Sequence, residues 1–389
     1  MPWHGWDGSW TCAEPVSARA DAGLARGDGV AAPATTKPAA PEAADTASTG
    51  IGISAREIRQ RFPALFQPSR AIFWTDLLAS TAVGWAGFAL ALAWSGPASL
   101  LAQIVAVLGL YRAVLFIHEL AHLRPGAIPH FERVFDALVG IPLLVPSLMY
   151  VGSHGDHHRR NTYGTDADPE YEPMAHWSRA RILASTGIML TVPLLLVLRW
   201  GVVAPLSWLL PPLRRLTVAK LSTLVVNVRY RRPAPTAEAL PRWRLGERGA
   251  AALVWSVAAG VSMGLVPVEV LWRWYAVTAA ILVINHFRTL TAHRYENRGE
   301  RMDTRGQLAD SINLRGIPGL TVLLAPVGLR YHGLHHLVPA VPYHHLGSLH
   351  RELIDALPVD SPYRLTVRHS LTGTLRALLE RAARNTAAG

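Results

Sequence analysis

Three short histidine clusters hold most of the chemistry that this 389-residue sequence could perform. They read His118-Glu-Leu-Ala-His122, His154-Gly-Asp-His157-His158 and His332-Gly-Leu-His335-His336. On a helix, residues three and four positions apart share a face, so each cluster can turn two or three imidazoles toward one centre. A transition-metal ion rarely takes more than six ligands, and imidazole suits iron, zinc and copper. Eight converging histidines therefore predict two metal ions, with iron preferred if the site performs oxygen chemistry.

A ninth histidine, His293, follows the last apolar stretch of the chain, and we predict it as a further ligand. A helix through that stretch would deliver His293 to the level of the clusters. His286 would lie about 10 Å deeper by helical rise, and we expect it to be buried and hydrogen-bonded. Histidines at a membrane edge outside such clusters are usually interfacial side chains. This interpretation covers His130, His176, His344, His345 and His350.

Acidic and amide residues close to the clusters are candidates to hold the histidine rings. A metal-bound histidine normally donates its second ring N–H to an oxygen, which fixes the orientation of the ring. The candidates near the clusters in sequence are Glu119, Asp156, Asp166, Asp168, Asp310 and Asn313. Sequence leaves open which of them pairs with which imidazole.

Long uncharged stretches must position these residues. Leu77 to Tyr111 carries no charge, and Gly96-Pro97 divides it into two pieces. Each piece is close to the roughly 20 residues that a spanning helix needs, so a transmembrane hairpin is predicted. A second hairpin is predicted from Gly249–Val268 and Trp274–Phe287.

Three further apolar segments are less regular. Ile182 to Leu213 contains Arg199 and two prolines, and it is either a short tight hairpin or a pair of interfacial helices. Ala137–Ser153 and Gly316–Leu329 both run into a histidine cluster, and we interpret them as re-entrant or interfacial supports.

The loop from Arg214 to Arg248 indicates the orientation in the membrane. It has nine basic residues against Glu238 and Glu247, which favours the cytoplasmic side. The chain is then expected to cross the membrane an even number of times before this loop and again after it. Every histidine cluster would therefore lie on the cytoplasmic face.

Composition supports a membrane protein, since 50% of the residues are hydrophobic and 17% are charged. The net charge of +11 comes mainly from arginines that flank apolar segments, so nucleic-acid binding is not expected. The single cysteine, Cys12, rules out disulfides and iron–sulfur clusters held by one chain.

The predicted fold is an all-α integral membrane protein with two or more transmembrane helical hairpins and a cytoplasmic helical cap that holds a histidine-rich dimetal site. We expect residues 1–55 to be a disordered tail because of their Ala-, Pro- and Gly-rich composition. Residues 56–350 are expected to form the membrane domain. Residues 351–389 are expected to be a soluble tail, helical around Leu371–Ala383.

The cluster pattern HxxxH, HxxHH, HxxHH, interleaved with hydrophobic hairpins, resembles the membrane fatty-acid desaturase and hydroxylase superfamily over roughly residues 70 to 350. The stretches 157–170, 288–294 and 328–336 are similar to bacterial members. The resemblance implies two irons held by the eight cluster histidines, with His293 matching an extra histidine near the last spanning helix. Thr289 stands where some desaturases carry an asparagine that holds a metal-bound water.

The resemblance further implies O₂ as co-substrate, a lipid acyl chain carried by CoA, a carrier protein or a glycerolipid as substrate, and a ferredoxin or cytochrome b5-like electron donor. Acyl-chain desaturation in a bacterial inner membrane is the function we predict. The main alternative is a diiron hydroxylase or ketolase acting on a carotenoid or another lipid. Two other hypotheses are an intramembrane zinc protease, suggested by the H-E-x-x-H pattern at His118, and a histidine-rich metal carrier.

Overall fold

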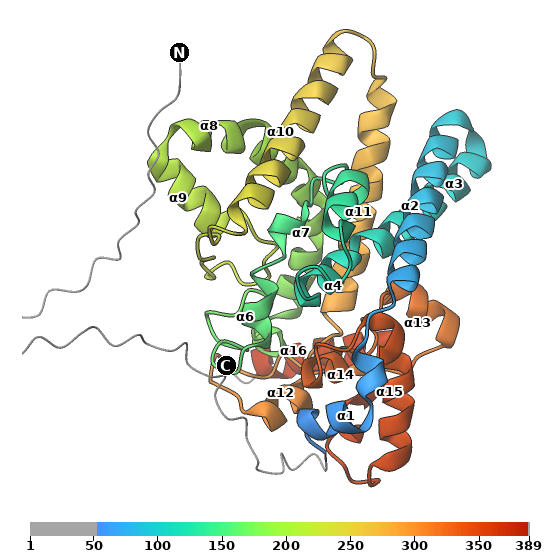
Figure 1. The fold of residues 1–389 in the computed structure, drawn as a ribbon, viewed down its shortest axis with the longest axis vertical. Helices are drawn as coiled ribbons and strands as arrows, with labels where there is room; N and C mark the ends of the chain where they lie inside the picture. The colour runs from blue at the N-terminus through green and yellow to red at the C-terminus, as the bar shows by residue number, and fades with distance from the viewer. Residues whose placement is uncertain (1–52, 388–389) are drawn as a thin grey trace, which may run out of the picture. The chain divides into compact units, whose positions relative to one another are not determined.

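The computed structural model describes residues 53–387, and these belong to one compact unit, residues 47–389. The prediction for residues 1–55 therefore falls almost entirely outside the described residues. Helices make up nearly all of the regular structure (Figure 1). The first, α1 (Ala55–Arg61), starts at the N-cap Ser54, whose side chain accepts from the amide of Glu57 while the Glu57 carboxylate accepts from the amide of Ser54.

The first predicted hairpin is present as α2 (Arg70–Ala93) and α3 (Gly96–Val114). Gly96 has φ +60°, a conformation that glycine adopts without strain, and it makes the tight turn between the two helices. Small residues let the helices approach closely, because a Cβ on Gly109 would lie 2.7 Å from the backbone nitrogen of Gly84. After Leu115 the chain continues as α4 (Phe116–His122).

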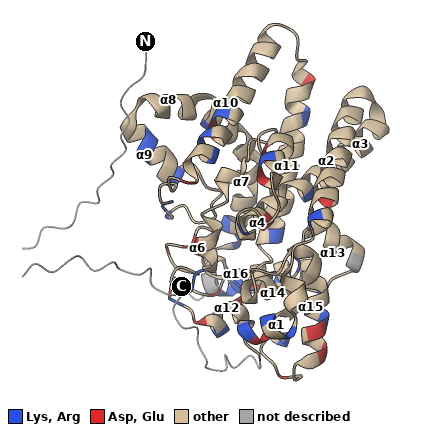
Figure 2. Cartoon of the chain, in the orientation of Figure 1, with Lys and Arg blue, Asp and Glu red and all other residues tan. Residues whose placement is uncertain are grey.

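Four helical stretches among residues 53–387 are long and apolar enough to cross a membrane. They are Arg70–Ala93, Gly96–His122, Arg179–Leu209 and Val268–Thr289. Large apolar side chains lie exposed on them, as at Leu100 (61% exposed) and Leu183 (64% exposed), where lipid would cover them. In Figure 2 the outer ends of α2 and α3 carry no charged residue. The predicted all-α membrane fold is confirmed.

The segment from Ile182 to Leu213, predicted as a tight hairpin or a pair of interfacial helices, has a different structure. Helix α7 (Arg179–Leu198) continues through a π-helical turn, η5 (Arg199–Val203), into α8 (Ala204–Leu209). The chain turns back only at Leu210, where α9 (Pro211–Lys220) begins. Arg199 does not end the helix, because its buried guanidinium donates to Glu247 Oε1 (3.2 Å), Ser222 Oγ and the Leu221 carbonyl.

Helices α10 (Leu240–Ser262) and α11 (Val268–Thr289) stand where the second hairpin was predicted. Figure 1 shows them rising side by side to a common loop. Helix α10 begins nine residues earlier than expected, inside the basic loop. Its Glu247 is 1% exposed and pairs with Arg199 and Arg214, so this charged start is stabilised within the protein.

Short elements form the cap below the spanning helices. The two apolar segments predicted as supports contain η2 (Asp136–Gly140), η3 (Ser147–Met149) and α13 (Pro318–Leu324), and they lead into α6 (His154–His158) and α14 (His332–Leu337). The remaining elements are η1 (Pro63–Phe66), α5 (Phe131–Phe135), η4 (Met174–His176), α12 (Thr304–Asp310), α15 (Tyr343–Ala356), η6 (Arg364–Thr366) and α16 (Leu371–Ala387).

The C-terminal residues pack onto this cap. Strand β1 (Asn313–Leu314) pairs in parallel with β2 (Val367–Arg368). The expected boundary at residue 350 falls inside α15, and Leu353 and Tyr363 share one buried core with Leu334 of α14. The third histidine cluster is therefore supported by residues on both sides of that boundary.

Candidate metal centre

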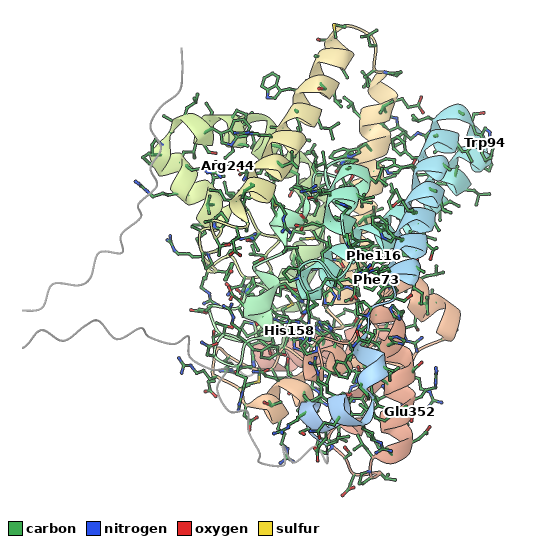
Figure 3. All side chains as sticks on the ribbon, viewed as in Figure 1. Phe73, Trp94, Phe116, His158, Arg244 and Glu352 are labelled. Carbon is green, nitrogen blue, oxygen red and sulfur yellow. The ribbon has the colours of Figure 1, made fainter. Side chains whose placement is uncertain are left out.

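The first two clusters lie on short helices at the inner ends of the spanning segments. His118 and His122 are one helical turn apart on α4, which restarts after the break at Leu115. Helix α6 consists of the second cluster itself, and Gly152, at φ +90°, directs the chain into it. In Figure 3, His158 is labelled at α6, within the cap of short elements.

The third cluster forms most of α14, and β1 fixes the start of that helix. The Oδ1 of Asn313 accepts a hydrogen bond from the amide of Leu334 at 2.9 Å, which satisfies an unpaired donor of the first turn. A Cβ on Gly333 would lie 3.1 Å from the Asn313 side chain. Glycine in the second position of the cluster therefore lets the asparagine approach.

The nine predicted histidines converge in two groups among residues 53–387, each with ligand atoms within 4.8 Å of one another. The first group is His118, His122, His154, His158 and His335. The second group is His157, His293, His332 and His336. Residues four apart stay in one group, whereas adjacent histidines point about 100° apart around a helix and divide between the groups. One turn of helix with the HxxHH pattern thus directs imidazoles to both groups.

The ring nitrogens within each group face one another. The Nε2 atoms of His154 and His158 are 3.0 Å apart, and those of His293 and His332 are 2.8 Å apart. The Nε2 atoms of His118 and His122 are buried and have no hydrogen-bond partner in the described part of the chain. Leaving a buried polar atom unpaired costs about 1–3 kcal/mol. Converging lone pairs and unpaired nitrogens fit a metal ion in each group, and all-imidazole donors fit iron.

Burial keeps three of these imidazoles in the form that binds metal. It lowers the pKa of His154, His158 and His335 well below the usual histidine value, and the neighbouring imidazoles add to this effect. A neutral imidazole keeps a lone pair for coordination. These three rings are therefore ligand-competent without first having to lose a proton. Burial acts in the same direction on His157, but the carboxylates of Asp168 and Glu170 outweigh it and raise the pKa of that histidine.

The sequence places this geometry in a known family. The family model described as fatty acid desaturase matches residues 95–367. The chain belongs to the fatty acid desaturase family. It is also 40% identical over 319 residues to a ceramide hydroxylase of Caulobacter vibrioides (strain NA1000 / CB15N), an alignment that covers 81% of this chain and 89% of that protein. The chain is thus an oxidoreductase of the desaturase and hydroxylase type that acts on lipids, and the protease and metal-carrier hypotheses are set aside.

Two of the predicted acidic residues hold a histidine ring in this desaturase-family site. Asp168 is fully buried and accepts from His157 Nδ1 at 2.9 Å. Asp310 lies 3.3 Å from His293 Nδ1 and also accepts from Tyr163 and Tyr171. Both contacts leave the Nε2 of the histidine facing its group, as an outer-sphere oxygen does in metal sites.

Glu119 contacts both the first histidine cluster and a distant helix. Its Oε1 lies 3.5 Å from His118 Nδ1, while its Oε2 accepts from the backbone amide of Tyr343 at 3.1 Å. This carboxyl group therefore joins the first histidine cluster to the start of α15.

The other four predicted residues have structural partners instead. Asp156 accepts from Tyr230 at 2.7 Å and pairs with Arg159, which ties the basic loop to α6. Asp166 is exposed and pairs with Arg229. Thr289 accepts from Arg288, and Asn313, described above, caps α14. These four residues are close to the clusters in sequence but do not contact an imidazole, because short helices and turns direct their side chains elsewhere.

His293 itself lies beyond α11 and not on it. The helix ends at Thr289, and an isolated bridge between His293 and Ser311 holds the segment that follows. His286 is buried and contacts Ser185 Oγ at 3.1 Å, so the expected buried, hydrogen-bonded role is confirmed. The histidines predicted to be interfacial stay outside both groups; His344 accepts from Ser69, and His350 contacts Tyr363.

Glu170, Tyr150 and Tyr163 were missed as site residues. Glu170 Oε1 lies 2.5 Å from His154 Nδ1, and its Oε2 accepts from Tyr150 at 2.9 Å. Tyr163 contacts His293 Nδ1 at 2.8 Å. Burial raises the pKa of Glu170 to about 7, against which the nearby charge of His157 acts. Glu170 follows Asp168 by two residues, so one turn supplies carboxylates to both groups.

Replacement of Glu170 by glutamine is expected to lower the metal affinity of the first group about 10–100-fold, the usual effect of losing an outer-sphere partner. Metal content after dialysis against graded chelator measures this change. Glu172→Gln is the matched control, because Glu172 lies two residues away and faces Arg229 at 3.6 Å. Equal metal retention in both variants would contradict the role of Glu170.

Proposed function

We propose that this chain is an O₂-dependent, iron-containing lipid hydroxylase whose substrate is a ceramide. The observation that carries the proposal is the 40% identity to a ceramide hydroxylase, which extends over 81% of this chain and 89% of the relative. The convergence of nine histidines in two groups supports the iron part of the proposal.

The five-histidine group would hold one iron and the four-histidine group the other. When bound, such an iron pair supplies the activation of O₂ that breaks an unreactive C–H bond. The balanced reaction takes a lipid C–H, O₂, two electrons and two protons to a C–OH and one water.

The residues of the chain orient and shield this chemistry. Three carboxylates lie beside the Nδ1 atoms of histidines. Asp168 accepts from His157, Asp310 lies beside His293, and Glu170 lies beside His154. In each case the Nε2 of the histidine points into its group. Burial of His154, His157 and His293 to 3% exposure or less keeps water away from the rings. The spanning helices, with their apolar surfaces, would hold the lipid chains.

Electrons would come from a separate ferredoxin or cytochrome b5-like protein, because the single cysteine cannot hold an iron–sulfur cluster. We place the chain in the bacterial inner membrane with the site on the cytoplasmic face. The support is that Tyr230 and Arg232 of the basic loop contact Asp156 and the Val151 carbonyl beside α6. A basic loop favours the cytoplasm, and its contacts beside α6 support a site on the same side.

Desaturation of an acyl chain is the second candidate, favoured by the match of residues 95–367 to the fatty acid desaturase model. It uses the same O₂ and electrons but removes two hydrogens from neighbouring carbons and releases two waters. Carotenoid oxidation would use the same centre, although the ceramide-hydroxylase relative makes a sphingolipid the stronger proposal.

Expression of the chain in a bacterium that makes ceramide but lacks this enzyme tests the proposal. We expect ceramide that has gained one oxygen atom, detected by mass spectrometry of the extracted lipids. The control is the same chain carrying His157→Ala. Ceramide that is unchanged beside acyl chains that have lost two hydrogens would instead assign desaturation, and an oxygenated carotenoid in a pigment-producing host would assign the third activity.

A further inference from the structure

Residues 315–329 form a loop that leaves the cap beside the third histidine cluster and returns to it, and we call them the α13 loop. The amide of Leu314 donates to the Arg330 carbonyl at 2.7 Å, and Arg330 Nε donates to the Leu314 carbonyl at 3.2 Å. These bonds close the base of the loop, as in a compact surface loop whose ends lie side by side. The α13 loop is therefore a unit with its own surface.

The tip of the α13 loop has its apolar side chains outside and its polar side chain inside. Helix α13 carries no charged residue (Figure 2). Ile317, Leu320 and Leu323 are each at least half exposed. Thr321, the one hydroxyl residue of the helix, is buried instead. A helix that faces water turns its polar residues outward, so this contiguous apolar patch marks a surface that another apolar phase covers.

Contacts with two spanning helices place the tip at membrane depth. The hydroxyl of Tyr111 on α3 donates to the Leu324 carbonyl at 2.8 Å, and α13 also packs against α11. By helical rise, Tyr111 lies about 22 Å from the turn at Gly96, which is the outer end of the first hairpin. The apolar core of a bilayer is about 30 Å thick. The exposed face of α13 therefore lies where lipid surrounds the protein, near the edge of the apolar layer.

Two arginines stand at the base of the α13 loop. Arg315 is exposed, and its side chain has no ion pair or hydrogen bond within residues 53–387. Arg330 is half-buried, and its guanidinium lies 5.0 Å from the centroid of the Tyr331 ring. Arginines at the ends of an apolar segment favour the headgroup level, where their charge stays solvated while apolar neighbours enter the acyl layer. The apolar tip and the basic base thus match the two layers of one leaflet.

We propose that the α13 loop is inserted into the leaflet nearest the histidine groups, with Leu320 and Leu323 among the acyl chains and Arg315 at the level of the headgroups. The partner of this surface is bilayer lipid. The insertion does not depend on the proposed reaction. Because the loop returns to the cap two residues before His332, it holds the third histidine cluster at the surface of that leaflet.

Spin labelling of the full chain in lipid nanodiscs tests the insertion. Cys12→Ser removes the single native cysteine, so a nitroxide attached to Leu320→Cys reports on one position. Collisions with O₂, which concentrates in lipid, are compared with collisions with a nickel chelate, which stays in water. We expect O₂ to dominate at Leu320→Cys, as at Leu100→Cys on the exposed face of α3. Leu323→Cys should give the same result as Leu320→Cys.

Val359→Cys is the matched control for an exposed apolar residue outside the bilayer. Val359 is 87% exposed and follows α15. That helix starts at Tyr343, which contacts Asp76 of α2, and runs about 20 Å away from the spanning helices (Figure 1). The ratio of O₂ to nickel collisions should be severalfold lower at Val359→Cys than at Leu320→Cys. Arg315→Cys should lie between the two, since the headgroup layer admits both reagents.

Two other outcomes would overturn the proposal. Nickel collisions that dominate at Leu320→Cys and Leu323→Cys would show that the loop is exposed to water. Few collisions with either reagent would show that a second copy of the chain or another protein covers the patch. The measurement needs no metal, substrate or turnover, so a failure of the proposed function leaves its result unaffected.

Discussion

Replacement of His335 by alanine is expected to abolish lipid oxidation, because His335 is the imidazole that α14 contributes to the first histidine group. His336→Ala should have the same effect on activity through the second group. The loss should exceed the about 10–100-fold caused by removing an outer-sphere partner. Product formation and iron content of the purified chain are the measurements. We expect about two irons per wild-type chain and fewer in each variant.

The two variants should differ in which iron they lose, and Mössbauer spectra of the partly loaded proteins would show this. His345→Ala is the control, since His345 belongs to neither group among the described residues and should keep both metal and activity. A wild-type chain that contains one zinc and no iron would refute the dimetal site. Retained activity in His335→Ala would remove that residue from the ligand set.

Replacement of Asp168 by alanine is expected to have the largest effect on stability. The fully buried carboxylate accepts from His157 and from the amides of Gly164 and Glu170, all at 2.8–3.0 Å. Alanine would leave these donors buried and unpaired, at about 1–3 kcal/mol each. We expect a lower thermal unfolding temperature in detergent together with loss of iron from the second group.

Asp168→Asn separates the two roles of this residue. Its side-chain oxygen can still accept from a backbone amide, so stability should be partly restored while iron binding stays weakened. Asp166→Ala is the control, because the Asp166 side chain is 71% exposed and such substitutions usually change stability by less than about 0.5 kcal/mol. Wild-type-like unfolding and iron content in Asp168→Ala would contradict this account.

The histidine groups could be predicted from sequence because their geometry is local. Spacings of three and four residues bring imidazoles together on any helix, whatever surrounds it. The position of His293 beside the clusters was also predictable from its place at the end of an apolar stretch. The spacing argument did not separate His157 from His158, although the angle between adjacent helical residues directs them to different groups.

The supporting residues could not be predicted, because their positions depend on tertiary contacts. Glu170 follows His154 by sixteen residues in the sequence, and only folding brings its Oε1 to 2.5 Å from His154 Nδ1. Asp156 lies inside a cluster and yet bonds to Tyr230, 74 residues away. In the sequence, Arg199 suggested that its apolar segment is interrupted. In the structure, Glu247 from a distant helix neutralises the guanidinium of Arg199, and Ser222 accepts a hydrogen bond from it.

The division of adjacent histidines between the two groups has a mechanical consequence. His157 with His158, and His335 with His336, are joined by single peptide units, and each pair extends from one helix toward both centres. The two centres are therefore coupled through α6 and α14, because a shift of either helix moves one imidazole of each group at the same time. A variant that displaces α6 or α14 should disturb both groups together.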